Sequence, residues 1–165
     1  MKFRNTALRM QHIDSPLGGI TLAATPIGLA GLWFDAQRHW PDMTGWHPDD
    51  ADPVLQTAAA QVQDYFAGRR QSFDLPLDLS HGTAFQQAVW QALLAIPAGE
   101  TTSYGLLSAR IDRPAAVRAV GAAVGRNPIS VIVPCHRVIG SNGSLTGYAG
   151  GLDRKTALLA LEGAR

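Results

Sequence analysis

The sequence contains one cysteine, Cys135, and no long apolar run. A single cysteine excludes an internal disulfide and a Cys-x-x-Cys zinc or redox pair. Nowhere do about 18 apolar residues follow one another, and the opening residues MKFRNTALRMQHID lack the apolar core of a signal peptide. We therefore expect a cytoplasmic protein that makes no contact with a membrane.

Signals for nucleotide cofactors are also absent. The sequence has no Gly-Lys-Ser/Thr phosphate loop and no G-x-G-x-x-G motif after a predicted strand. The glycine-rich segment from Gly140 to Leu152, GSNGSLTGYAGGL, is instead typical of a loop that is flexible or that approaches another group closely. It carries Tyr148, which could stack on a ligand or donate a hydrogen bond to it. We expect no cofactor.

Charge is unevenly distributed along the chain. Residues 1–81 hold six Lys or Arg against nine Asp or Glu, whereas residues 82–165 hold eight against four, which gives net charges of −3 and +4. A basic half joined to an acidic half indicates that the second half faces a polyanion. The counts alone favour a simpler interpretation, a chance arrangement of solvated charges.

Residues 1–79 are predicted to form a small α+β domain. Short apolar runs alternate with turn signals between Arg9 and Phe34, which favours three antiparallel strands joined by tight turns. The Pro- and Asp-rich stretch 39–53 is predicted to be a loop. A helix is predicted over 54–66, with Tyr65 on its buried face and its end near Gly68, and the segment SFDLPLDL after it is predicted to be extended.

Residues 80–165 are predicted to form a mainly helical domain, so that the whole chain has the fold class α+β. Thr83 and Gln86 form a capping box before a helix that stops at Pro97. A second helix is capped by Ser103. A third starts at Pro114, whose missing amide is tolerated at a first helical position. The short turn between the last two helices makes them a candidate helix-turn-helix.

The third predicted helix, PAAVRAVGAAVGRN, carries Ala or Gly on almost every side and one long side chain, Arg118, near its middle. Close packing against neighbouring helices explains such a composition and is preferred before further evidence. A smooth helix with one projecting arginine also suits the narrow minor groove of DNA.

Cys135 lies in the stretch PCHRVIG, after the run PISVIV, which is predicted to be a short buried strand. A free cysteine is usually buried and inert. His136 and Arg137 weaken that interpretation, because a cationic neighbour favours the thiolate, the nucleophilic form of a group whose ordinary pKa is about 8.5.

His136 could act as a base for this thiol if a carboxylate orients it. Only Asp153 and Glu162 follow it in the chain. Asp153 is predicted to cap the last helix, which leaves Glu162 as the better candidate. A surface carboxylate at a helix end would explain Glu162 equally well.

Together these motifs resemble a known family. RAVGAAVGRNP, PCHRVIG, TGYAGGLDRK and LLALEG follow one another as in the O6-alkylguanine-DNA alkyltransferases, also called methylated-DNA-protein-cysteine methyltransferases. The close resemblance covers residues 83–163, and the first half is similar to the family's variable amino-terminal unit. It implies irreversible transfer of an alkyl group from O6 of guanine in DNA to the protein's own cysteine, once per molecule. Activity on O4-alkylthymine is left open.

The resemblance implies a role for each matching residue. Cys135 attacks the alkyl carbon of a guanine turned out of the duplex, and His136 acts as the base through a water. Glu162 orients His136, and Tyr104 donates a proton to the leaving base. Arg118 fills the gap left in the base stack.

The resemblance also implies double-stranded DNA carrying alkylated bases as the partner, bound through the minor groove. The expected DNA-binding residues are Ser103, Arg118, Ala119, Gly121, Ala122 and Arg126. The expected pocket residues are Asn127, Pro134, Arg137, Tyr148, Ala149 and Gly150, with Asn127 bracing the turn before the cysteine.

Two departures from the family pattern affect these expectations. Ala149 stands where some members carry a serine whose hydroxyl contacts O6, so a backbone amide is the expected donor there. The zinc-bearing members use additional cysteines that this chain lacks, so no metal is expected. We expect a monomer in solution and leave clustering on DNA open.

Three other functions remain open at this point. A protein that senses lesions without repairing them fits the helix-turn-helix, but such relatives have another residue in place of Cys135. A cysteine hydrolase with a Cys-His-Glu triad gives no reason for the small-residue helix that carries Arg118. A transcription factor reads the major groove with polar side chains that this helix lacks.

Overall fold

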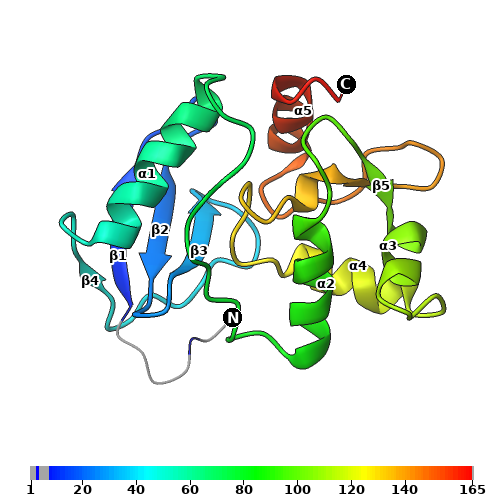
Figure 1. The fold of residues 1–165 in the computed structure, drawn as a ribbon, viewed down its shortest axis with the longest axis horizontal. Coiled ribbons are helices and arrows are strands. Elements are labelled where there is room, and N and C mark those ends of the chain that lie inside the picture. Colours follow the sequence, from blue (N-terminus) through cyan, green and yellow to red (C-terminus); the bar gives the residue numbers. More distant parts are fainter. Residues whose placement is uncertain (1–2, 4–7, 165) are drawn as a thin grey trace.

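A sheet covered by one helix lies beside a second, mainly helical part (Figure 1). The computed structural model describes residue 3 and residues 8–164. Within these residues no helix has both the length and the apolar character needed to span a membrane. The predicted fold class, α+β, is confirmed.

The sheet of the first part has four strands in the order β3-β2-β1-β4. Strands β1 (Arg9–Ile13), β2 (Ile20–Ala24) and β3 (Leu29–Phe34) are antiparallel, as predicted. The stretch predicted to be only a loop contains β4 (His47–Pro48), which pairs in parallel with β1. Two residues are too few to show the alternating pattern by which a strand is recognised.

Helix α1 (Pro53–Phe66) covers one face of this sheet (Figure 1). It begins at Asp52, whose side chain accepts a hydrogen bond from the Leu55 amide at 3.0 Å, and it ends before Gly68, which has a φ of 78°. A small cluster, Leu8, Ala23, Trp33 and Trp46, covers the opposite face. Every residue of β2 and β3 is therefore buried.

The two parts share one hydrophobic core. Strand β3 lies at the edge of the sheet, where the Leu32 amide donates to the Pro128 carbonyl of the second part at 2.8 Å. The connector 72–79, predicted to be extended, pairs with the sheet through a bridge between Leu77 and Leu29 and is otherwise irregular. Pro76 explains this, because a proline cannot donate to a strand ladder.

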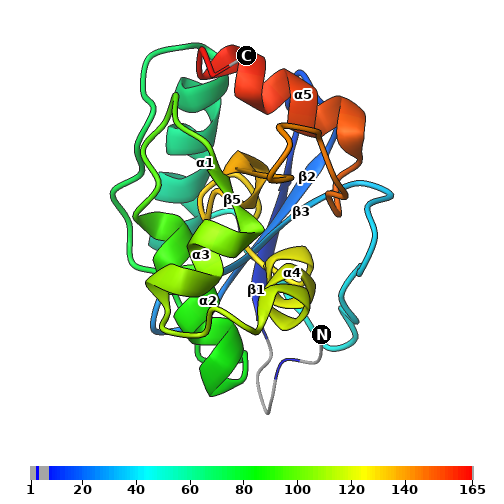
Figure 2. The same ribbon diagram turned by 90° about the vertical axis from the view of Figure 1, so that its right-hand side faces the viewer.

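The second part contains the helices α2 (Ala84–Leu94), α3 (Tyr104–Arg110), α4 (Val117–Gly125) and α5 (Leu152–Leu161). The capping box before α2 is confirmed, and so is the Ser103 cap of α3. Helices α3 and α4 form the predicted helix-turn-helix and pack on α2 (Figure 2). The parallel pair β5 (Thr102–Ser103) and β6 (Val138–Ile139) joins the start of α3 to the segment that follows the cysteine.

Two helix starts differ from the prediction. Pro114 lies in a turn closed by a hydrogen bond from the Ala116 amide to the Arg113 carbonyl, and α4 begins only at Val117. Proline suits the second position of a turn as well as the first position of a helix, so local sequence does not distinguish the two. At α5, Gly151 occupies the cap position, and Asp153 lies within the first turn.

Candidate active site

Cys135 begins a short 3-10 helix, η1 (Cys135–Arg137), after a turn that replaces the strand predicted for PISVIV. Within the turn, Val131 has a φ of 72°, which a β-branched residue rarely adopts. The Asn127 side chain spans the turn, donating to the Val133 carbonyl at 2.7 Å and accepting from the Ile129 amide at 3.0 Å. The β-branched residues of this run are buried in the shared core, and the run pairs with β3 only through an isolated bridge between Ile129 and Leu32.

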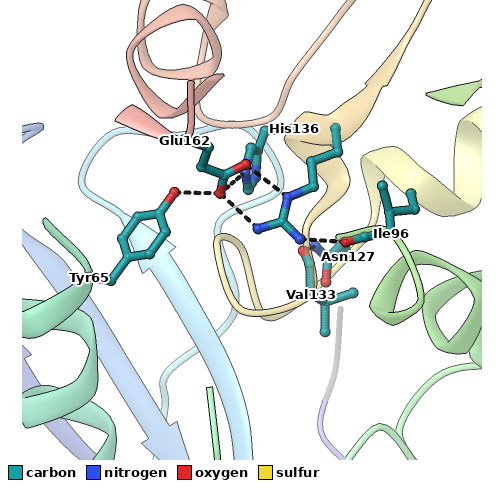
Figure 3. Close-up of polar contacts among 7 residues, drawn as sticks. Tyr65, Ile96, Asn127, Val133, His136 and Glu162 are labelled. Atoms are coloured by element: carbon teal, nitrogen blue, oxygen red, sulfur yellow. Dashed lines mark hydrogen bonds and ion pairs between the residues drawn. The ribbon is translucent and has the colours of Figure 1, made fainter. Parts of the chain in front are cut away.

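The fully buried His136 ring lies against Glu162, which caps α5, with 2.8 Å between Nε2 and Oε2 (Figure 3). Burial alone would raise the pKa of Glu162, but hydrogen bonds from Arg137 and His136 outweigh it and lower that pKa to about 2. An ionised carboxylate only accepts hydrogen bonds. Nε2 of His136 therefore carries the ring proton and donates a hydrogen bond to Oε2 of Glu162.

The other ring nitrogen of His136, Nδ1, is therefore the unprotonated one. It is buried and has no hydrogen-bond partner within the part of the chain that the structure describes. Burial lowers the pKa of His136 and keeps the ring neutral, although the contact with Glu162 acts in the opposite direction. The residue after Cys135 thus provides a neutral nitrogen base.

Glu162 receives hydrogen bonds from both parts of the chain. Arg137 donates from Nε to Oε1 and from Nη2 to Oε2, each at 2.8 Å, in the two-point geometry favoured by arginine and carboxylate. The guanidinium also donates to the Ile96 carbonyl. From α1, the Tyr65 hydroxyl donates to Oε2 at 2.7 Å (Figure 3). These donors hold the carboxylate in one orientation toward His136.

The prediction that cationic neighbours keep Cys135 as a thiolate is wrong for the resting site. Cys135 is 5% exposed, and burial raises the pKa of its thiol to about 11 despite the opposing effects of Asn127 and Lys155. Arg137 does not compensate, because its charge is paired with Glu162. The thiol is neutral at pH 7, so its proton has to leave when the sulfur reacts.

A cavity of about 360 Å³ lies between the helix-turn-helix, the glycine-rich loop and residues 38–39 of the first part. This volume falls in the range of about 300–1,000 Å³ found for small-molecule sites. Four predicted residues line it: Tyr104, Gly121, Tyr148 and Ala149. Cys135 is not one of the lining residues, but it lies near Tyr148, where burial and the electrostatic effect of Cys135 both raise the pKa of the phenol.

The glycine-rich loop is held in place by two side chains. The Tyr104 hydroxyl accepts a hydrogen bond from the Thr146 hydroxyl at 3.0 Å, which leaves the phenolic proton for donation to a ligand. Lys155, fully buried on α5, donates to the carbonyls of Val138 at 2.6 Å and Thr146 at 3.0 Å. The loop is thereby fixed as one wall of the cavity.

The predicted DNA-binding residues lie on and next to the helix-turn-helix. Arg118, Ala122 and Arg126 recur every four residues and are exposed, which places them on one face of α4 and its end. Ala119 is exposed as well, whereas Gly121 and Ser103 are partly buried. The buried face of α4 packs on α2, where the Trp90 indole donates to the Ala123 carbonyl at 2.8 Å. The helix therefore packs closely on one side and presents small residues on the other.

The remaining predicted pocket residues are not among those that line this cavity. Asn127 and Pro134 belong to the turn before the cysteine, and Arg137 lies in the ion pair with Glu162. A Cβ at Gly150 would come within 2.7 Å of the Tyr148 ring, so this glycine allows the tyrosine to pack. Among the described residues, no three His, Cys, Asp or Glu side chains gather closely enough to hold a metal ion.

Sequence reasoning missed several residues of the site. Arg38 and His39 line the cavity from the first part, and the Arg38 amide donates to the Ala149 carbonyl at 2.9 Å. Thr146 and Tyr65 were also missed. A tyrosine on a predicted buried face needs a partner for its hydroxyl, but no local spacing reveals an acceptor 97 residues away.

Two family models match the chain. One is described as "6-O-methylguanine DNA methyltransferase, ribonuclease-like domain" and matches residues 8–79. The other, "6-O-methylguanine DNA methyltransferase, DNA binding domain", matches residues 84–164.

Proteins from several organisms are similar over nearly their whole length. A "Methylated-DNA--protein-cysteine methyltransferase" of Mycobacterium tuberculosis is 53% identical over 158 residues, which cover 96% of this chain and 94% of that protein. The protein of the same name from Haemophilus influenzae is 44% identical, with 95% and 87% covered.

Solved structures agree with these matches. M. tuberculosis OGT in complex with DNA superposes with a TM-score of 0.87 at 51% identity, covering 94% of this chain and 93% of the other. The O6-methylguanine-DNA methyltransferase of Pyrococcus kodakaraensis superposes with a TM-score of 0.61 at 22% identity, covering 94% and 99%, which is a likeness of fold.

Proposed function

The chain belongs to the 6-O-methylguanine DNA methyltransferase family, and from this membership we propose how its residues carry out the reaction. The protein repairs DNA by direct reversal: it moves the alkyl group from O6 of guanine to its own cysteine. A lesion sensor lacks the cysteine, and a hydrolase or a transcription factor does not fit this family, so those alternatives are set aside.

Entry of the damaged base is the first proposed step. A base stacked in a duplex cannot present its O6 to a buried thiol, so the alkylated guanine rotates out of the helix and into the cavity. Unstacking costs a few kcal/mol, and less for a weakly paired base. Arg118, exposed on α4, fills the gap and offsets part of this cost. The small residues of α4 allow its backbone to approach the minor groove.

Alkyl transfer follows. The thiol proton of Cys135 passes through a water to Nδ1 of His136, and the ionised Glu162 stabilises the imidazolium that forms. The sulfur attacks the alkyl carbon while the bond from carbon to O6 breaks, and that bond's electron pair goes to the guanine. Tyr104 donates its proton to the leaving guanine and thus stabilises the developing negative charge. The proton on His136 then restores the tyrosine through solvent.

The product explains why each molecule acts once. Cys135 ends as a thioether, and this bond has no carbonyl that water could attack, unlike the ester of an acyl-enzyme. No group of the site can regenerate the thiol. The protein is therefore a stoichiometric methyltransferase that is consumed by its own reaction.

Several properties of the complex belong to the same proposal. The protein binds double-stranded DNA carrying alkylated bases through the minor groove, acts as a monomer and works in the cytoplasm. The net charge of +4 on residues 82–165 supports the use of the second half as the DNA-facing domain, with residues 1–79 as a separate amino-terminal domain. Clustering on DNA is tested by the binding stoichiometry on a long duplex.

The range of accepted lesions depends on Ala149. It lines the cavity without a hydroxyl, so a backbone amide of the same segment is the proposed donor to O6. Comparison of Ala149→Ser with the natural protein on O6-methylguanine and O4-methylthymine duplexes tests this assignment.

The observation that carries the proposal is the buried His136–Glu162 pair, whose free Nδ1 belongs to the residue after the chain's only cysteine. Incubation with a duplex carrying O6-methylguanine should add one methyl mass to a peptide containing Cys135, at no more than one per protein. Cys135→Ser should bind the same duplex and accept no methyl group. Multiple turnovers, or a methyl group on another residue, would contradict the mechanism.

A further inference from the structure

We propose that Tyr65 is a positioning residue for alkyl transfer, through which the amino-terminal part controls the carboxylate that orients the catalytic histidine. Tyr65 lies on α1 of the amino-terminal part, and its hydroxyl donates to Oε2 of Glu162 at 2.7 Å (Figure 3). Neither the predicted site nor the matched family descriptions assign a role to it. The inference rests on the proposed function, because it concerns the same histidine.

The carboxylate oxygen involved is the one that faces the base. Oε2 accepts hydrogen bonds from Tyr65, from Nε2 of His136 and from Arg137, whereas Oε1 accepts one from Nε of Arg137. Tyr65 and His136 therefore compete for the electron density of one atom. A change at the tyrosine hydroxyl must alter the hydrogen bond to the histidine.

Tyr65 is well placed to act as a fixed donor. It is 1% exposed, and its ring packs against Phe66 and Phe73, with centroid distances of 5.3 and 5.5 Å. Burial and the Glu162 carboxylate raise the pKa of the phenol far above its ordinary value, so the hydroxyl keeps its proton at every working pH. The amino-terminal part thus supplies a neutral donor that does not titrate.

The effect on His136 has a definite sign. The charged and titratable groups that act on the His136–Glu162 pair are Lys155 of α5, Arg137 of η1 and Tyr65 of α1. Without the Tyr65 hydroxyl, Glu162 is less stabilised as a carboxylate and accepts more strongly from His136. The imidazolium is then favoured, the pKa of His136 rises, and a larger fraction of the base is protonated at a given acidic pH.

The test is the pH dependence of single-turnover methyl transfer in the full-length protein. Tyr65→Phe removes one oxygen atom and keeps the ring. Because His136 is neutral at pH 7 in both proteins, the rate there should change by no more than about tenfold, the range given by one hydrogen bond of ordinary net strength. The acidic limb of the variant's rate profile should move to higher pH. Val62→Ala is the matched control, because Val62 is fully buried on the same helix and its truncation weakens packing without removing a hydrogen-bond donor to Glu162.

A second replacement protects the test against a folding defect. Site-specific 3-fluorotyrosine at position 65 keeps the hydroxyl and donates a stronger hydrogen bond, so the acidic limb should move to lower pH. Opposite shifts in the two variants, with the limb unmoved in Val62→Ala, support the inference. An unmoved limb in a folded Tyr65→Phe protein, or the same shift in Val62→Ala, overturns it.

Failure of the underlying function has a different signature. If the natural protein accepts no methyl group from the duplex, the proposed function is wrong. If the natural protein transfers normally and only the tyrosine variants show no shift, the function stands and the role of Tyr65 is withdrawn.

Discussion

Asn127 provides the sharpest quantitative prediction, because one buried side chain holds both ends of the turn that delivers the cysteine. Asn127→Ala removes the bond to the Val133 carbonyl and the bond from the Ile129 amide. Asn127 is 5% exposed, so water cannot easily replace these partners. Each of these two buried groups left unsatisfied costs about 1–3 kcal/mol, and the free energy of unfolding should therefore fall by about 2–6 kcal/mol.

The kinetic effect should be larger than the loss of stability alone implies. The bonded turn keeps Val131 at a φ of 72° and ends directly before Cys135, so its relaxation displaces the sulfur. Asn127 also opposes the rise in the pKa of the thiol, and its loss leaves that pKa higher. We expect single-turnover transfer to slow by about 100-fold, as is found for small misplacements of reacting groups.

The sequence offers a matched control for this experiment. Asn142 accepts two hydrogen bonds from Ser144, at 3.1 and 2.7 Å, but it is exposed. Asn142→Ala should change stability by no more than about 0.5 kcal/mol. Urea titration followed by tryptophan fluorescence gives both free energies. Equal losses in the two variants, or full activity in Asn127→Ala, would refute the reasoning.

Three further predictions concern the pocket and the buried pair. Arg118→Ala should slow repair of duplex DNA far more than reaction with free O6-benzylguanine, and equal losses in the two rate measurements would remove the base-flipping role. Tyr104→Phe should slow transfer by about 100-fold while the dissociation constant for DNA stays nearly constant, because the lost donor acts in the transition state. The pKa of Glu162 falls from 4.5 to about 2 on folding, so its ionisation contributes about 3 kcal/mol of stability above pH 4.5, which is lost progressively as the pH falls toward 2. Urea titrations from pH 7 to pH 3 should show this decline, and a flat profile would contradict it.

Local signals predicted much of the fold. The capping box of Thr83 and Gln86 and the hairpins around β2 involve neighbours in sequence, and both are confirmed. Pro114 and the PISVIV run were misread because each pattern is compatible with two local structures, and for the PISVIV run a contact with the distant strand β3 takes part in the outcome.

The site was predictable only in part, for a similar reason. The motifs predicted the contact of His136 with Glu162, and the structure contains it. The sequence alone was equally compatible with Glu162 as a surface carboxylate. The protonation state of the thiol was predicted wrongly, because adjacency does not reveal burial or the pairing of Arg137 with a carboxylate. Tyr65 was placed correctly on a buried helix face, but its partner is defined by the docking of the two parts.

The burial of Cys135 also determines how long an unreacted molecule remains usable. Oxidants and small electrophiles in a cell react mainly with accessible thiolates. Cys135 is 5% exposed and its thiol is protonated, which gives them little opportunity. Each molecule has one thiol and cannot regenerate it, so every thiol lost to an oxidant removes the capacity to repair one lesion. The low reactivity of Cys135 preserves this capacity during long intervals without DNA damage.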